Sequence, residues 1–300
     1  MSPVKTWLQA LRVPFLTASL VPVVLGTAVA WQKIRHIDWF LFFLALLGVA
    51  CLQSGTNLAN DYFDHLSKND DSNLTPTPVS GGSRVIQEGL LPAATVLKSA
   101  LVFFGVGSLI GIYLAWHLRS AEILWLGVVG VFCGFFYTAA PLKLGYRGLG
   151  EMLVGLCFGP LPVMGAYCVQ TQRITPEAFW ASVPVGILIA LVVFINEFPD
   201  HNADKAVGKK TLVVSLGPER AIKVYRASLA VTYIYTAILI CMRVFPISTL
   251  PVFLTLPLAF RAVRVSKDNL RNVPGLLPAN FATIQLHLVF GLLLSAGFLF

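Results

Sequence analysis

Nine apolar segments, each long enough to cross a lipid bilayer, constrain the fold of this 300-residue chain more than any other feature. A transmembrane helix needs about 20 mainly apolar residues. The segments are 11–31, 38–56, 93–117, 121–140, 149–169, 178–197, 220–241, 244–263 and 279–299. The chain is 56% hydrophobic and 12% charged, which is more apolar surface than a soluble domain of this length can cover. The sequence therefore predicts an all-α, polytopic membrane protein with nine transmembrane helices.

The distribution of Lys and Arg predicts how the chain is oriented in the lipid bilayer. If the N-terminus is cytoplasmic, 17 of the 22 Lys and Arg residues fall on the cytoplasmic side. The positive-inside rule favours this orientation, which places the C-terminus on the opposite side of a cell membrane. The loops account for the net charge of +8, so nucleic acid is not an expected partner.

A polar stretch, NLANDYFDHLSKNDD at residues 57–71, directly follows the second apolar segment. On a continuous helix, Asn57, Asp61, Asp64 and Asp71 share one face, with Asn60 at its edge. Several carboxylates on one face repel one another unless a cation lies among them, and ligand sets made of oxygen suit hard ions such as Mg²⁺. The alternative is a solvated acidic loop that closes a transmembrane segment.

A second polar stretch, NEFPDHNAD at residues 196–204, follows the sixth apolar segment. Asn196 and Asp200 repeat the N-x-x-x-D spacing of the first motif, and Asp204 adds a carboxylate one helical turn later. Both motifs end membrane-length segments on the predicted cytoplasmic side, so we expect them to face each other across one cavity. Because Mg²⁺ is usually held by a few carboxylates together with phosphate oxygens and water, this arrangement predicts a diphosphate substrate.

Basic and aromatic residues on the same side of the membrane are expected to complete the site. The candidates are Arg84, Tyr137, Lys143, Arg147, Lys205 and Lys209. The cations are predicted to contact phosphate, and Tyr137 is predicted to offer an aromatic face to a cationic intermediate. For Arg84 the alternative is an ordinary surface arginine, and for Arg147 it is a membrane anchor.

The two motifs resemble those of the UbiA superfamily of intramembrane prenyltransferases. The resemblance lies in NDYFD at residues 60–64 and in D-x-x-x-D at 200–204, followed by K-x-x-x-K-K-T-L at 205–212. It extends over nearly the whole chain. It implies a single membrane domain, residues 1–300, whose nine helices surround a central cavity that opens to the cytoplasmic side.

Four stretches resemble the naphthoate branch of the superfamily, the 1,4-dihydroxy-2-naphthoate polyprenyltransferases. They are NLANDYFD at 57, YRGLGE at 146, FGPLPVMGAYCVQ at 158 and DKAVGKKTLVVSLG at 204. This resemblance implies transfer of a polyprenyl group from its diphosphate to 1,4-dihydroxy-2-naphthoate, with loss of CO₂ and diphosphate, in menaquinone biosynthesis. Two positions depart from the pattern of many members: Lys68 replaces a third Asp, and NEFPD replaces NNxRD.

The resemblance also implies roles for the candidate residues. The Mg²⁺ ligands would be Asp61, Asp64, Asp71, Asp200 and Asp204. The diphosphate would contact Asn57, Asn60, Arg84, Lys143, Arg147, Asn196, Lys205 and Lys209. Asp64, Asp200 and Tyr137 would act directly in catalysis.

Two other functions remain open from the sequence. An enzyme of the same kind would use a different acceptor, such as another naphthoate, a hydroxybenzoate or a glycerol-phosphate lipid. A transporter of cations or metabolites would use the intramembrane acids as a pathway. The transporter is less favoured because both acidic motifs lie on one predicted face of the membrane.

Overall fold

The protein is all-helical, as the sequence predicted. The computed structural model describes residues 2–73 and 76–300, and this part of the chain contains no β-strand apart from one isolated bridge between Thr77 and Ser80. The first half contains α1 (Pro3–Ala10), η1 (Val13–Leu16), α2 (Thr17–Ile34), α3 (Trp39–Leu66), α4 (Asn69–Ser72), α5 (Ala93–His117) and α6 (Ala121–Phe136). The second half contains η2 (Leu144–Tyr146), α7 (Gly150–Phe158), α8 (Pro160–Thr171), α9 (Pro176–Ala206), α10 (Leu212–Leu216), α11 (Pro218–Cys241), η3 (Ile247–Thr255), α12 (Leu256–Asp268) and α13 (Val273–Gly297).

Eight helical segments in the described part of the chain are long and apolar enough to cross a membrane, one fewer than the nine predicted. The exception is the expected span 121–140, where α6 has only 16 residues. At 1.5 Å per residue it is about 24 Å long, shorter than a hydrocarbon core of about 30 Å. The helix ends at Phe136, and Pro141 opposes its continuation through residue 140, because proline disfavours helical backbone at the residue before it.

The expected span 149–169 is divided into two helices, α7 and α8. The break lies at Gly159, which has φ −115° and ψ −96° and precedes Pro160. A Cβ atom at Gly159 would lie 2.5 Å from the Cα of Gly186 on α9, so only glycine permits this approach. The break therefore brings the chain against α9 at the middle of the bundle.

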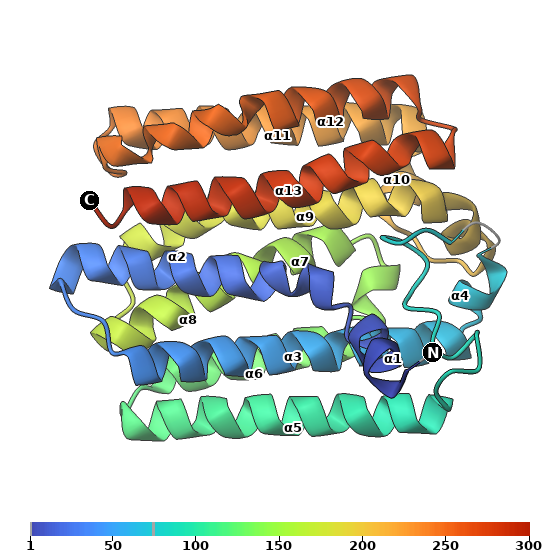
Figure 1. The fold of residues 1–300 in the computed structure, drawn as a ribbon, viewed down its shortest axis with the longest axis horizontal. Helices are drawn as coiled ribbons and strands as arrows, with labels where there is room; N and C mark the ends of the chain where they lie inside the picture. The colour runs from blue at the N-terminus through green and yellow to red at the C-terminus, as the bar shows by residue number, and fades with distance from the viewer. Residues whose placement is uncertain (1, 74–75) are drawn as a thin grey trace.

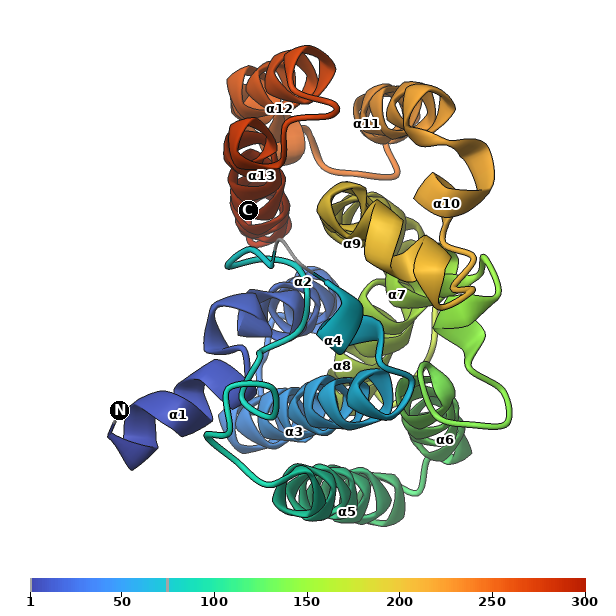
Figure 2. The same ribbon diagram turned by 90° about the vertical axis from the view of Figure 1, so that its right-hand side faces the viewer.

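The long helices run roughly along one direction (Figure 1). Viewed along the bundle, α4 lies over one end of the ring formed by α2, α3, α6, α7, α8 and α9 (Figure 2). The N-terminal helix α1 lies at that end, and the C-terminus lies at the other (Figure 1). The largest buried apolar cluster joins α2, α8, α9, α11, α12 and α13, whereas a separate cluster joins α1, α3 and α5.

A cavity of about 1310 Å³ lies between these packed clusters. Its lining reaches from Asp64 and Asp204, near the ends of α3 and α9, to Leu114 and Ile123, at the opposite ends of α5 and α6. The cavity is therefore long, acidic at one end and apolar over the rest of its length.

Candidate active site

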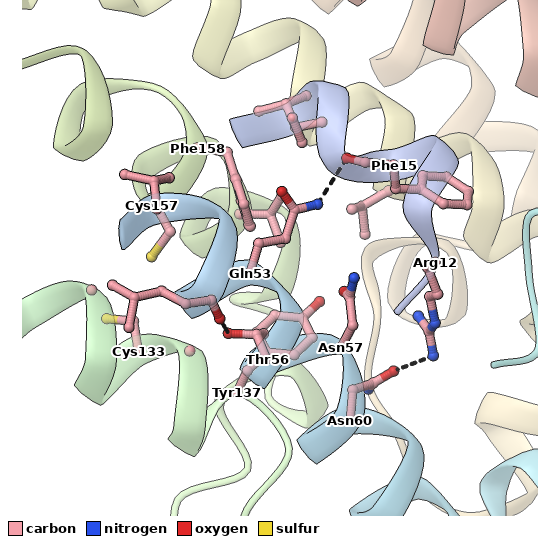
Figure 3. Close-up of a pocket in the computed structure, with 18 of the residues that line it drawn as sticks. Arg12, Phe15, Gln53, Thr56, Asn57, Asn60, Cys133, Tyr137, Cys157 and Phe158 are labelled. Atoms are coloured by element: carbon pink, nitrogen blue, oxygen red, sulfur yellow. Dashed lines mark hydrogen bonds between the residues drawn. The ribbon is translucent and has the colours of Figure 1, made fainter. Parts of the chain in front are cut away.

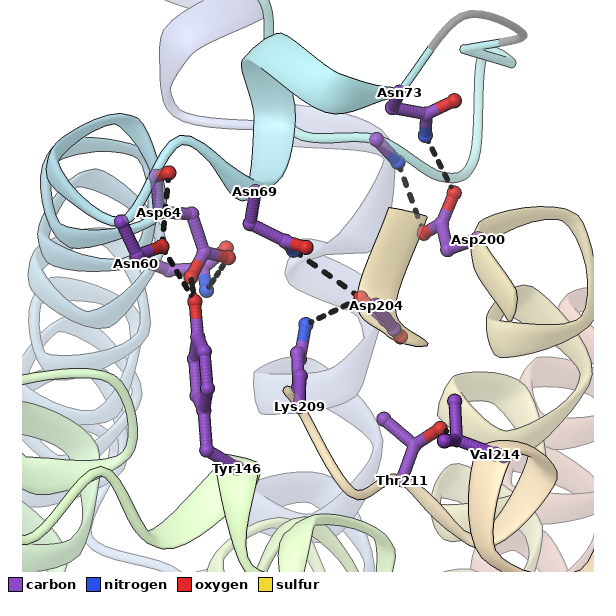
Figure 4. A network of polar contacts seen from close by, with 12 residues as sticks. Asn60, Asp64, Asn69, Asn73, Tyr146, Asp200, Asp204, Lys209, Thr211 and Val214 are labelled. Carbon is purple, nitrogen blue, oxygen red and sulfur yellow. Dashed lines mark hydrogen bonds and ion pairs between the residues drawn. The ribbon is translucent and has the colours of Figure 1, made fainter. Parts of the chain in front are cut away.

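The first acidic motif occupies the last two turns of α3. Asp64 is buried, with 4% of its surface exposed, and lines the cavity. Its Oδ1 accepts a hydrogen bond from the Tyr146 hydroxyl at 2.7 Å, and its Oδ2 accepts one from Asn60 Nδ2 at 2.8 Å (Figure 4). These two donors hold the carboxylate of Asp64 in a fixed orientation at the acidic end of the cavity.

Asp61 lies beneath that surface and does not line the cavity. Its carboxylate forms an ion pair with Arg12 and accepts hydrogen bonds from the backbone N–H and hydroxyl of Ser83. Arg12 also donates to Asn60 Oδ1 at 3.0 Å (Figure 3). Burial lowers the pKa of Arg12, but the nearby carboxylates of Asp61 and Asp70 outweigh it and raise the pKa above its usual value. The protonated side chain of Arg12 therefore connects the α1–η1 segment to Asn60 and Asp61 of the first motif.

The second motif lies in the last turns of α9 and is held by residues that follow the first motif. Asp200 accepts hydrogen bonds from Asn73 Nδ2 at 2.8 Å and from the backbone N–H of Gly81 at 3.1 Å. Asp204 accepts one from Asn69 Nδ2 at 3.2 Å and forms an ion pair with Lys209 at 3.2 Å (Figure 4). Both acids line the same cavity as Asp64, so the two motifs meet at one site.

The predicted stripe of acids on one continuous helix is wrong at its last member. Helix α3 ends at Leu66, and Lys68 has a left-handed conformation with φ +61°, so Asp70 and Asp71 belong to the separate helix α4. Asp70 is 3% exposed and lines the cavity. Asp71 is exposed, does not line the cavity, and lies 3.6 Å from His65 Nδ1.

Two of the predicted basic residues line the cavity. Lys209 Nζ lies 5.4 Å from the centre of the Tyr146 ring in addition to its ion pair. Burial alone would lower the pKa of Lys209, but the carboxylates of Asp64 and Asp204 raise it well above its usual value. Arg84 also lines the cavity and donates to the backbone carbonyl of Asp70.

The other three predicted basic residues lie outside the cavity lining. Lys143 lies 5.3 Å from the centre of the Tyr146 ring. Arg147 is exposed and donates to the carbonyl of Leu142 at 2.6 Å, which closes the turn before it. Lys205 is exposed on α9.

The remaining predicted contacts lie farther along the cavity. Asn57 donates to the carbonyl of Leu11 at 3.1 Å, and Asn196 Oδ1 accepts from Asn280 Nδ2 at 2.7 Å. Both line the cavity, as does Tyr137, whose ring lies beside Thr56 (Figure 3). The predicted aromatic face is thus present at the boundary between the polar and apolar parts.

The acidic end has the oxygen atoms that a hard divalent cation requires. Buried oxygens of Asn69 (Oδ1), Asp70 (Oδ2) and Asp204 (Oδ2) have no hydrogen-bond partner among the described residues. Burial, together with the carboxylates of Asp64 and Asp61, raises the pKa of Asp70 to about 8, which a bound cation would reverse. Across residues 2–73 and 76–300 no three His, Cys, Asp or Glu side chains gather closely enough to hold a metal alone.

Comparison with known proteins identifies the family. The model of the UbiA prenyltransferase family matches residues 19–295. This chain belongs to the UbiA prenyltransferase family. As a member of the UbiA family, it is a multi-pass membrane enzyme that transfers prenyl groups.

Named relatives of this UbiA prenyltransferase act on naphthoates. It is 33% identical to 1,4-dihydroxy-2-naphthoate octaprenyltransferase of Bacillus subtilis, over 97% of this chain and 91% of the relative. It is 29% identical to 2-carboxy-1,4-naphthoquinone phytyltransferase of Synechocystis, over 98% of this chain and 93% of the relative. A solved structure of a UbiA homolog from Archaeoglobus fulgidus bound to DMAPP and Mg²⁺ shares its fold, with a TM-score of 0.66 and 16% identity, and covers 97% of this chain and 99% of that one.

Sequence reasoning missed several residues of the UbiA site. Arg12 was counted only among the cytoplasmic charges. Asp70 did not lie on the predicted helical face. Tyr146 belongs to YRGLGE, one of the four stretches that resemble the naphthoate branch, but no role was predicted for it. Glu197 was noted only as a departure from NNxRD, although it is buried and lines the cavity. A buried charge beside a motif was the available signal for Glu197, because a carboxylate within an apolar segment is rarely without a function.

Proposed function

We propose that this UbiA prenyltransferase transfers a polyprenyl group from polyprenyl diphosphate to 1,4-dihydroxy-2-naphthoate, releasing diphosphate and CO₂. The observation that carries the proposal is a single long cavity with acids of both motifs at one end and apolar lining beyond Tyr137. The names of the relatives from Bacillus subtilis and Synechocystis support the naphthoate acceptor. The product would be a demethylmenaquinol, the reduced form of a demethylmenaquinone.

The acidic end would bind the diphosphate together with Mg²⁺. Asp64, Asp200 and Asp204 are the cavity-lining carboxylates from the predicted metal set, and Asp70 adds a fourth from α4. The A. fulgidus homolog, which is described as bound to DMAPP and Mg²⁺, supports a divalent ion here. Bound Mg²⁺ would neutralise negative charge on the departing diphosphate.

The protein's own cations would contribute to the same step. Lys209 and Arg12 line the cavity, and both are held beside carboxylates in the free protein. When the C–O bond of the donor breaks, preorganised cations stabilise the charge that develops on diphosphate. Arg84 lines the same end of the cavity, where its guanidinium group would contact phosphate in a bidentate manner.

The apolar length of the cavity would hold the isoprenoid tail and exclude water from the allylic cation. Tyr137 lies at the boundary of this region, where its ring would face the cation. The acceptor carbon would attack there to form the new C–C bond. On this arrangement the acidic end and the N-terminus face the cytoplasm.

The direct test is conversion of 1,4-dihydroxy-2-naphthoate and a polyprenyl diphosphate by membranes that contain the protein, with Mg²⁺ and with EDTA. We expect Mg²⁺-dependent demethylmenaquinol, detected as demethylmenaquinone after oxidation in air, together with CO₂, and loss of both products with EDTA. Product from a hydroxybenzoate or a glycerol-phosphate lipid, with none from the naphthoate, would overturn the acceptor assignment. Product formation at an unchanged rate in EDTA would overturn the metal assignment.

A further inference from the structure

Two buried glutamates face each other beside the cavity. Glu197 lies on α9 and is 7% exposed, and Glu151 lies on α7 and is 4% exposed. Their carboxyl groups lie within hydrogen-bonding reach of each other. Glu151 Oε1 also accepts a hydrogen bond from the backbone N–H of Leu212 at 2.7 Å, so this carboxyl group is fixed from behind.

The contact between the glutamates requires a proton. In the described part of the chain, no N–H or O–H group donates to Glu197 Oε2 or Glu151 Oε2, although both atoms are buried. Two carboxylates in contact in a dry environment repel strongly, whereas a carboxylate and a carboxylic acid attract. One proton shared between the two carboxyl groups would turn this repulsion into an attraction and would leave one basic oxygen available.

Glu197 is the member of the pair that reaches substrate, because it lines the cavity and Glu151 does not. It lies three residues before Asp200 and seven before Asp204 on the same helix. At 1.5 Å per residue, it is about 4.5 Å and 10 Å deeper than these acids along the axis. If the diphosphate binds at the acidic end, Glu197 lies at the depth where the allylic carbon and the acceptor ring meet.

A purely structural role does not explain the pair. Among the described residues neither glutamate forms an ion pair, so burying two carboxyl groups here costs stability, and the hydrogen bond from Leu212 accounts for only one oxygen of Glu151. A buried polar atom without a donor, aimed into a substrate cavity, is typical of groups that act on a ligand.

We propose that the Glu151–Glu197 pair is the proton acceptor for the hydroxyl group of the aromatic acceptor, with Glu197 as the catalytic residue and Glu151 as a positioning residue. This inference rests on the proposed function and adds the group that activates the ring.

The proposed step balances as follows. Glu197 accepts the proton of the hydroxyl next to the carboxylate-bearing carbon, and the O–H electron pair moves into the ring. That carbon forms a bond to the allylic carbon, while the C–O bond breaks and its electrons leave on diphosphate. The ring carboxylate then departs as CO₂, its C–C electrons restore the aromatic ring, and Glu197 returns the proton to the oxygen.

The test compares wild-type protein with Glu197→Gln in lipid nanodiscs. The first measurement is kcat for a series of dihydroxynaphthoates whose ring substituents lower the pKa of the hydroxyl. The second is binding of an unreactive thio analogue of the polyprenyl diphosphate. We expect kcat for Glu197→Gln to fall about 100-fold or more, as for removal of a general base, with donor Kd within about twofold. The deficit should shrink steadily as the acceptor hydroxyl becomes more acidic.

Glu122→Gln is the matched control, because Glu122 is exposed, lies outside the cavity lining and accepts a hydrogen bond only from Ser120 in the described structure. We expect it to retain kcat within about twofold. Wild-type kcat in Glu197→Gln, or the same deficit with every acceptor, would overturn the proposal. Absence of naphthoate transfer by the wild type would instead refute the proposed function, and the same comparison would then use the phenolic acceptor that is prenylated.

If Glu197→Gln does not bind the donor, kcat of Glu151→Gln is measured with the same series of acceptors instead. Its amide would preserve the contact with Leu212 and would donate a hydrogen bond to Glu197, which makes that carboxylate a weaker base. We expect about a tenfold loss of kcat that also diminishes with more acidic acceptors. Unchanged kcat in Glu151→Gln would then refute the proton-sharing pair.

Discussion

Asp70 and Asp71 are neighbours with opposite surroundings. Asp70 is buried and lines the cavity, whereas Asp71 is exposed beside His65. The helical spacing of the sequence favoured Asp71 as a metal ligand. The burial of Asp70 in the structure favours Asp70 instead. We expect Asp70→Asn to reduce prenyl transfer at least tenfold more than Asp71→Asn, because only Asp70 adds charge at the cavity. Rates measured with saturating donor at fixed Mg²⁺ decide between them, and a greater loss in Asp71→Asn would restore the prediction from spacing.

The pKa of Asp70 gives the site a pH dependence. Because burial and neighbouring acids raise this pKa to about 8, a cation that binds below pH 8 must displace a proton from Asp70. We expect Mg²⁺ affinity, measured by calorimetry with the thio analogue of the donor, to rise between pH 6.5 and 8. Asp70→Asn should lose most of this rise. A slope that persists unchanged in Asp70→Asn would assign the proton to another group.

The sequence predicted individual residues well where spacing alone determines their position. Asn196, Asp200 and Asp204 follow one helix to its end, and the structure places all three on the cavity. It could not predict Arg12, because the ion pair with Asp61 joins positions 49 residues apart. Such a contact depends on how α1 packs against α3, which no local pattern specifies.

At the scale of elements, the segment after α4 is the least regular part of the site and holds much of it together. Residues 76–84 include Gly81 and Gly82, both with positive φ. The backbone N–H of Gly81 donates to Asp200, and Ser83 donates to Asp61. This one loop therefore orients a carboxylate from each motif: Asp61 of the first and Asp200 of the second.

Gly82→Ala tests this loop. Its φ of +76° costs a residue with a side chain about 1–2 kcal/mol, and the added Cβ would lie 2.3 Å from Asp70 Oδ2. We expect at least a tenfold loss of prenyl transfer and a lower melting temperature. Gly89→Ala is the control, because Gly89 has φ +67° but nothing within 4 Å, so it has the backbone strain without the clash. Equal losses in the two variants would show that strain alone matters.

Element boundaries were predictable only in part. Hydropathy located every long helix, but it could not distinguish α6 from a full span or find the break between α7 and α8. The break depends on a single residue, Gly159, inside a window that remains apolar on average, and α6 ends at Phe136 although the apolar window continues to residue 140. The close approach at Gly159 exists only because Gly186 lies opposite it on another helix.

At the scale of the whole molecule, the two apolar clusters explain how a long cavity survives inside a helical bundle. The cluster around α9 and α13 and the cluster around α3 and α5 are each packed independently. No buried residue of either cluster lines the cavity; its apolar walls come in part from two smaller clusters, one with Val23 and Leu114 and the other with Ala18 and Val192. This arrangement was beyond sequence reasoning, because hydropathy in a membrane helix does not distinguish a face that packs on protein from one that faces lipid or a cavity.

The sidedness of the molecule is its remaining global prediction. The charge distribution places the acidic end of the cavity in the cytoplasm, because 17 of 22 Lys and Arg residues would lie there. Lys267, at the end of α12, and Arg173, between α8 and α9, are both exposed and belong to opposite predicted sides. Cys241 is the exposed native thiol and is first replaced by serine. In this Cys241→Ser background, Lys267 or Arg173 is replaced by Cys, and the protein is treated with an impermeant maleimide.

We expect Lys267→Cys to react only in inside-out vesicles and Arg173→Cys only in right-side-out vesicles. The physical reason is that moving the basic loops across the bilayer opposes the membrane potential and the translocation bias against Lys and Arg. The reverse labelling pattern would place the acidic end outside the cytoplasm. Labelling of both positions from one side would mean that the chain crosses the membrane an even number of times between them, whereas the predicted orientation requires an odd number. An acidic end that faces the cytoplasm would receive Mg²⁺ and a water-soluble naphthoate from the same compartment, while the apolar length of the cavity accepts the prenyl tail from within the bilayer.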